Sequence, residues 1–167
     1  MSEKFILNND QINQKIKRMA YEIYEDNYNA IQITIVGIEG QGLAFAKALH
    51  KELEKIFPIN YTLIPAAIDK KNPSAYKPGL EKYKKNIEKN ALVIVDDVLN
   101  SGRTIMHTIQ PFLSYKPSSV QVAVLINRDH KSFPVQVDFT GLSLATTIQD
   151  HVSVNLNKKG AYSASLK

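Results

Sequence analysis

The sequence predicts an α/β protein built on a central, mostly parallel sheet that is flanked by helices. Apolar runs rich in β-branched residues occur at 30–38 and 91–95, and each leads through a polar, glycine-containing turn into residues with helical apolar spacing. A strand that is apolar along its whole length is typical of a parallel sheet covered on both faces. The turns after such strands lie at their carboxyl ends, where open α/β sheets bind ligands.

The composition is that of one globular domain. In 167 residues, 44% are hydrophobic and 22% are charged, with a formal net charge of +5. These are ordinary values for a folded domain of this size. The chain has no cysteine, which excludes disulfides and thiolate chemistry and suits a reducing cytoplasm. No apolar run approaches the roughly 18 residues of a membrane span, so we expect a cytoplasmic protein with no membrane partner.

The remaining elements follow from the periodicity along the chain. A helix is expected from Asn9 or Asp10 to about Asn27, because apolar residues recur at helical spacing from Ile12 to Ile23. A second helix follows the 30–38 strand and is ended by Pro58. Further strands are predicted at 61–64, 120–126, 135–139 and 152–156, and the polar tail 158–167 is expected to be loosely held.

Residues 69–90 show no clear period and are basic. Seven lysines stand against three acids, so this segment carries a net +4 of the chain's +5. A loop of this length in a compact domain is usually functional or disordered. We therefore expect either a flexible lid that closes over an anionic substrate or a solvated loop.

A small polar turn follows the 91–95 strand and opens the next helix. Its residues are Asn100, Ser101, Gly102, Arg103 and Thr104. Backbone N–H groups at a helix start are unpaired, the helix dipole favours an anion, and glycine permits close approach. The two hydroxyls and the guanidinium add donors, so this turn is predicted to bind a phosphate.

Two adjacent acids, Asp96 and Asp97, stand directly before that turn. Carboxylates only accept hydrogen bonds, so a pair of them suits the two hydroxyls of a ribose or a hydrated Mg²⁺. An acid pair after a strand is often no more than a helix start, and the turn by itself is a weak motif. The acids and the turn together predict a site for a sugar phosphate.

A second candidate phosphate site is the glycine-rich turn Glu39, Gly40, Gln41 and Gly42. It also joins a strand to a helix. Its G-x-x-G-x-G order is not the dinucleotide fingerprint, and the Glu39 carboxylate disfavours an anion. A tight structural turn explains these glycines equally well.

The stretch 93–104, Val-Ile-Val-Asp-Asp-Val-Leu-Asn-Ser-Gly-Arg-Thr, resembles the phosphoribosyl diphosphate (PRPP) motif of type I phosphoribosyltransferases. The chain is most similar to the pyrimidine operon regulator / uracil phosphoribosyltransferase group, through 12–23, 117–134 and 138–141. This resemblance implies the type I phosphoribosyltransferase fold, whose central, mostly parallel sheet carries a small hood. It also implies a single domain over 1–167 with a flexible lid at about 69–90.

The function implied by the resemblance is that of a glycosyltransferase in nucleotide metabolism. Such an enzyme uses PRPP and Mg²⁺ to ribosylate a nucleobase, here most simply a pyrimidine (uracil), and works as a homodimer or a higher homo-oligomer. Asn100 supports a pyrimidine, because 6-oxopurine enzymes of this fold carry there an aspartate thought to handle the N7 proton. An amide cannot act as a general base.

The resemblance also assigns roles to individual residues. Asp96 and Asp97 would be catalytic and would meet Mg²⁺ indirectly, through PRPP or water. The turn 100–104 would hold the 5′-phosphate, and the loop 39–42 would face the diphosphate. The implied base-binding residues are Asn127, Arg128 and Phe139.

Two alternatives stay open. The first is an RNA-binding pyrimidine operon regulator, for which Lys17 and Arg18 lie on the corresponding helix. The basic charge concentrates instead in 69–90, so RNA ranks second as a partner. The other alternative is a protein that binds PRPP or a nucleotide without turnover.

Overall fold

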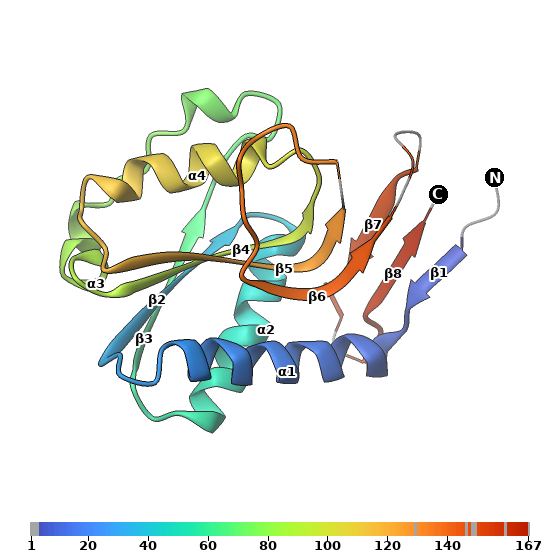
Figure 1. Ribbon diagram of the computed structural model, residues 1–167, viewed down its shortest axis with the longest axis horizontal. Coiled ribbons are helices and arrows are strands. Elements are labelled where there is room, and N and C mark those ends of the chain that lie inside the picture. The colour runs from blue at the N-terminus through green and yellow to red at the C-terminus, as the bar shows by residue number, and fades with distance from the viewer. Residues whose placement is uncertain (1–3, 129, 146, 148–149, 159, 167) are drawn as a thin grey trace.

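A computed structural model describes residues 4–128, 130–145, 147, 150–158 and 160–166 (Figure 1). Among these residues, five parallel strands form the central sheet in the order β3-β2-β4-β5-β6. The predicted α/β fold with a mostly parallel sheet is therefore confirmed. The strands are β2 (Gln32–Ile38), β3 (Asn60–Ala66), β4 (Ala91–Leu99), β5 (Ser119–Arg128) and β6 (Phe139–Leu144).

Helices cover both faces of this sheet (Figure 1). Helices α1 (Asn9–Asp26) and α2 (Gln41–Ile56) pack on one face, and α4 (Arg103–Leu113) packs on the other. The central strand β4 is therefore apolar toward both sides: Val93 and Val95 belong to one buried cluster, and Leu92 and Ile94 to the other. This double burial explains why the β4 sequence is a continuous apolar run rather than an alternating one.

The first helix begins with a reciprocal cap. The Asn8 side chain accepts a hydrogen bond from the backbone N–H of Gln11 at 2.9 Å, and the Gln11 side chain accepts one from the backbone N–H of Asn8 at 2.9 Å. This capping box satisfies two donors that a helix start leaves unpaired. Asn8 is thus the N-cap, one residue before the predicted start, and the apolar stripe from Ile12 to Ile23 is buried as expected.

A second, smaller sheet stands beside the carboxyl ends of the central strands (Figure 1). It is antiparallel, and within the described residues its order is β1 (Lys4–Leu7), β8 (Ser163–Leu166), β7 (Val152–Asn155). We call these three strands the hood. The prediction of a loosely held tail is wrong for 163–166, because β8 is the middle strand of the hood and the Ala164 side chain is fully buried.

The segment 69–90 contains short helices: η1 (Pro73–Ala75), η2 (Glu81–Tyr83) and α3 (Lys84–Ile87). Its second half is anchored, because Leu80 and Ile87 are buried in the core. Pro73 is buried as well. Whether the segment moves as a lid stays a prediction.

The strand expected at 135–139 begins only at Phe139, where it differs from the prediction. Val135 is buried beside Gly102 rather than in a sheet, and the Asp138 side chain accepts a hydrogen bond from the backbone N–H of Val122 at 2.7 Å. These contacts fix the segment between β5 and β6 to the α4 start and to β5. Across the described residues, no helix is both long and apolar enough to cross a membrane.

Candidate active site

A cavity of about 410 Å³ opens at the carboxyl ends of β4 and β5. The start of α4 forms one side of it and strand β7 of the hood forms another. This is the edge of the sheet at which the sequence predicts a ligand. The lining residues come from four places: Lys70 after β3; residues 96–102, 104 and 105 of β4 and the following turn; Arg128 of β5; and residues 151–154 at β7.

The two acids line this cavity and lie within the last part of β4. Pairing between β4 and β2 stops at Val95, whereas pairing with β5 continues to Leu99. The strand therefore has a neighbour on one side only where Asp96 and Asp97 occur, which opens the space next to them. The side chain of Asp96 is 5% exposed and that of Asp97 is 14% exposed.

Helix α2 closes the remaining space around Asp96. Gly42 lies so near that a Cβ on it would be 2.6 Å from Oδ1 of Asp96. Glycine is required here by this close approach. The glycine-rich turn and the acid pair, which are 54 positions apart in the chain, are thereby brought into direct contact.

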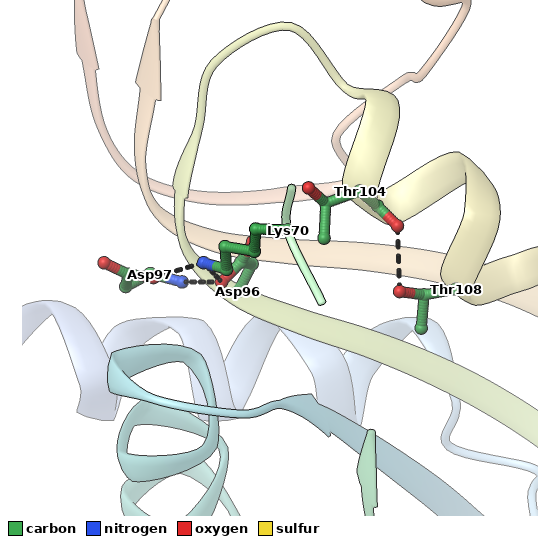
Figure 2. A network of polar contacts seen from close by, with 5 residues as sticks. All are labelled: Lys70, Asp96, Asp97, Thr104 and Thr108. Carbon is green, nitrogen blue, oxygen red and sulfur yellow. Dashed lines mark hydrogen bonds and ion pairs between the residues drawn. The ribbon is translucent and has the colours of Figure 1, made fainter. Parts of the chain in front are cut away.

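A lysine from the 69–90 segment reaches both carboxylates (Figure 2). The Lys70 Nζ lies 3.3 Å from Oδ1 of Asp96 and 3.7 Å from Oδ1 of Asp97. Lys70 sits in a turn held by Asp69, whose side chain accepts the Lys71 N–H at 2.8 Å and whose carbonyl accepts the Asn72 N–H at 3.1 Å. The turn thus places the ammonium group over the acid pair.

Burial and a like charge raise the pKa of Asp96 far above the ordinary value of 3.8. The largest cause is the loss of water around a side chain inside the protein, and the next is the negative charge of Asp97. The Lys70 ammonium lowers this pKa, but by less. A cation of higher charge at this place would stabilise both carboxylates as anions.

The predicted phosphate turn has the expected geometry. Gly102 is the N-cap of α4 with a φ of +84°, a conformation that favours glycine. The Ser101 carbonyl accepts N–H groups of Ser132 and Phe133, each at 3.0 Å, which fixes the turn to the connection after β5. Asn100, Ser101, Gly102 and Thr104 line the cavity. Arg103 is exposed and is not among the residues that line it.

The other predicted phosphate loop is placed differently. Glu39 and Gly40 are exposed, and none of the four residues 39–42 lines the cavity. The Gln41 side chain is bound to the hood: it accepts the backbone N–H of Leu156 at 2.7 Å and donates to the Asn157 side chain at 3.1 Å. This loop therefore joins the core to the hood, and Gly42 within it supports Asp96.

The three predicted base-binding residues are only partly brought together. Arg128 is buried, lines the cavity and donates from a guanidinium nitrogen to the Thr147 carbonyl at 3.0 Å. Asn127 is adjacent to it but does not line the cavity; its buried side-chain oxygen has no hydrogen-bond partner among the described residues. Phe139 opens β6, opposite Ala123, and is buried in the core cluster away from the cavity.

Sequence reasoning missed Lys70 as an individual residue and missed His151 and Ser153. Lys70 was visible only as one of seven lysines in a segment without a period. His151 and Ser153 line the cavity because β7 belongs to the hood. No local pattern could assign β7 to this place, since its partner β8 comes from the part of the chain expected to be loose.

The carboxylates of the site fit a metal ion that also has water or substrate oxygens as ligands. Among the described residues, no group of three or more histidine and acidic side chains is arranged to hold a metal ion. Asp96 and Asp97 supply carboxylate oxygens, which Mg²⁺ prefers, but too few for its six-fold coordination. Water and substrate oxygens would have to provide the rest.

The fold is that of an α/β protein whose cavity lies at the carboxyl edge of a parallel sheet, next to an acid pair, a helix start and the hood. Residues 2–159 match the phosphoribosyl transferase domain family, and the chain belongs to that family. The resemblance found in the sequence is thus confirmed, and the protein is a phosphoribosyltransferase, an enzyme of nucleotide metabolism.

Similar proteins agree with this assignment. The chain is 33% identical to "Bifunctional protein PyrR" of Fusobacterium nucleatum subsp. nucleatum, covering 93% of this chain and 92% of the relative. It is 32% identical to "Bifunctional protein PyrR" of Herpetosiphon aurantiacus, covering 95% and 92%. A hypoxanthine-guanine phosphoribosyltransferase from Bacillus anthracis has the same fold, with a TM-score of 0.75, 16% identity and full coverage of both chains.

Proposed function

We propose that this phosphoribosyltransferase transfers the phosphoribosyl group of PRPP to uracil, with Mg²⁺ as the cofactor. The observation that carries the proposal is the cavity, in which the acid pair lies between the α4 start and the hood. Asn100, in place of an acid, supports a pyrimidine over a 6-oxopurine. Similarity to proteins named PyrR supports the same choice.

The chain's residues would bind the two ends of the ribose phosphate. The first backbone N–H groups of α4 and the hydroxyls of Ser101 and Thr104 would hold the 5′-phosphate. Asp96 and Asp97 would accept hydrogen bonds from the ribose hydroxyls. Such contacts fix the sugar in one orientation, and orientation is a large part of what an enzyme supplies for a displacement.

The reaction would be displacement of diphosphate from the anomeric carbon by a ring nitrogen of the base, which forms the bond to carbon and loses its proton to water. Positive charge grows on the ribose as the bond to diphosphate lengthens, and the buried acid pair lies where it would stabilise that charge. Bound Mg²⁺ would neutralise the diphosphate and organise its oxygens. The hood strand β7 and Arg128 would surround the base and exclude water.

The test is diphosphate release from PRPP and Mg²⁺ with uracil, hypoxanthine, guanine, xanthine, adenine and orotate in turn. We expect turnover with uracil and its loss in the double variant Asp96→Asn, Asp97→Asn. Asp10, which is exposed and does not line the cavity, gives the matched control Asp10→Asn. Preference for another base would reject uracil as the substrate. Wild-type activity in the double variant would reject the assignment of Asp96 and Asp97 to the active site.

RNA-dependent regulation is the second candidate, because the relatives carry the name "Bifunctional". Lys17 is exposed on α1, but Arg18 is engaged with the Glu22 carboxylate at 2.6 Å and with the Thr140 carbonyl at 2.9 Å. RNA binding through phosphates would weaken steeply with salt. Titration of a pyrimidine-operon leader RNA at low and high salt tests it, and no binding at low salt would reject it.

A further inference from the structure

Lys70 makes a contact in the cavity that neither the predicted nor the proposed function uses. Its ammonium group is 3.3 Å from Asp96 and 3.7 Å from Asp97, among the residues that the structure describes (Figure 2). A single cation is therefore shared between two adjacent carboxylates. That is the position in which a divalent ion bridging the acids and a substrate would be expected.

The surroundings of Lys70 allow another cation to replace its ammonium group without a change in the core. The Lys70 side chain is 49% exposed, whereas both acids are nearly buried. Its backbone lies in the turn 69–72, before the first buried anchor of the segment at Pro73. A lysine on a flexible stem can leave without disturbing the core, while the acids, held by β4 and Gly42, cannot.

We propose that Lys70 is a built-in cation that occupies the acid pair in the substrate-free protein and keeps a free divalent ion out of it. The substrate, arriving with its metal, displaces the ammonium group. Displacement frees the Lys70 side chain, so occupation of the acid pair and release of Lys70 are one event. Lys70 is a positioning residue in this scheme, and the inference rests on the proposed function for the identity of the substrate.

The test measures metal binding without any substrate. Mn²⁺, whose free form has a sharp EPR signal, is titrated into the wild-type protein, Lys70→Met and Lys71→Met. Lys71 is the matched control, because it is the adjacent exposed lysine and does not line the cavity. We expect Lys70→Met to bind Mn²⁺ at least about tenfold more tightly than the other two, since loss of a cation beside buried carboxylates strengthens their attraction for another.

A triple variant tests where the additional Mn²⁺ binds. Adding Asp96→Asn and Asp97→Asn to Lys70→Met should abolish the extra Mn²⁺ binding. Equal affinity in Lys70→Met and Lys71→Met, or a gain that survives loss of both acids, would overturn the inference. Because no PRPP or base is present, a failure of the uracil assay leaves this result unaffected, and the two proposals can fail separately.

Release of the Lys70 side chain has its own readout. Acetylation of Lys70 by a small amine-reactive reagent, followed by mass spectrometry, should be slower than that of Lys71 in the substrate-free protein. PRPP with Mg²⁺ should raise the Lys70 rate several-fold relative to Lys71. An unchanged ratio in protein shown by calorimetry to bind PRPP would contradict displacement.

Discussion

Gly42 and Asp96 are in direct contact: a Cβ on Gly42 would lie 2.6 Å from Oδ1 of Asp96 and 3.1 Å from its Cα. The second distance involves backbone, so the contact cannot be relieved by turning the Asp96 side chain. The start of α2 and the end of β4 are therefore fitted to each other without room for a methyl group. This fit determines where the acid pair lies relative to the cavity.

Gly42→Ala should accordingly displace the acid pair. We expect a loss of about 1–3 kcal/mol in the free energy of unfolding, as for overpacked sites in protein interiors. Activity should fall more than about tenfold, because a small displacement of the acid pair proposed to act on the ribose is costly. Urea denaturation and the uracil assay measure the two effects.

Gly79→Ala is the control for that substitution. A Cβ at Gly79 would have no atom within 4 Å, and this glycine does not line the cavity. Stability and activity should stay at the wild-type level there. Equal stability in the two variants would show that the contact at Gly42 relaxes without cost.

The raised pKa of Asp96 gives the protein a specific pH dependence. Burial and the charge of Asp97 raise this pKa to about 8, so the folded state holds a proton that the unfolded chain loses near pH 4. Between these values the unfolded state binds fewer protons, and the free energy of unfolding falls as the pH rises. Asp96 thus destabilises the fold progressively from about pH 4 to about pH 8.

Asp96→Asn removes this titration. The stability of the variant relative to wild type should rise by more than about 1 kcal/mol between about pH 5 and about pH 8.5, since one pKa unit corresponds to about 1.4 kcal/mol. Chemical denaturation at both pH values measures the difference, and Asp10→Asn controls for loss of a carboxylate. A difference that does not change with pH would mean that Asp96 is ionised in the fold throughout.

Gln41 provides a test of the connection between core and hood. Gln41→Ala removes the acceptor for the Leu156 N–H and the donor to Asn157. A hydrogen bond of this kind contributes about 0.5–1.5 kcal/mol. The amides of β7 and β8 should therefore exchange with deuterium several-fold faster, while those of β4 keep the wild-type rate.

The control for this substitution is Gln32→Ala, which removes a side-chain hydrogen bond to Thr62 between β2 and β3. It lies outside the hood, so exchange in β7 and β8 should be unchanged. Equal exchange of the hood in Gln41→Ala and wild type would show that other contacts hold it in place.

The central sheet and the site on β4 were predictable from the sequence because each depends on local pattern. The run 91–95 has to be buried on both faces, and the residues after it combine acids, a glycine and hydroxyls within nine positions. A local pattern of this kind predicts both the burial of the strand and the polar site that follows it. Ser101, Gly102 and Thr104 line the cavity, and their binding of a phosphate stays a prediction.

What escaped prediction depends on pairing between distant parts of the chain. β1 and β8 are four residues each and become a sheet only by joining the two ends of the chain. The hydrogen bonds of Gln41 to residues 156 and 157 could not be predicted from the glycine-rich turn that contains it. The position of Lys70 in the site depends on its contact with Asp96, which is 26 positions away in the chain. Short strands and single polar contacts leave no period in the sequence.

The hood gives a last prediction, at Ala164. This residue is fully buried on the middle strand, opposite Leu7 on one side and Val154 on the other. Ala164→Asp would bury a carboxylate among apolar side chains, at a cost of several kcal/mol unless the group takes up a proton. We therefore expect the hood to open, because β1 and β7 both lose their shared partner.

Opening of the hood should leave the central sheet folded, since β2 to β6 pair among themselves. Hydrogen exchange should become fast at 4–7 and 152–155 but stay slow in β4, and uracil turnover should be lost while PRPP still binds at the α4 start. The control is Ala161→Asp, which places the same charge on an exposed position three residues earlier. If the two variants exchange alike in the hood, β8 does not hold β1 and β7 together; if β4 also becomes fast in Ala164→Asp, the hood and the central sheet unfold as one unit.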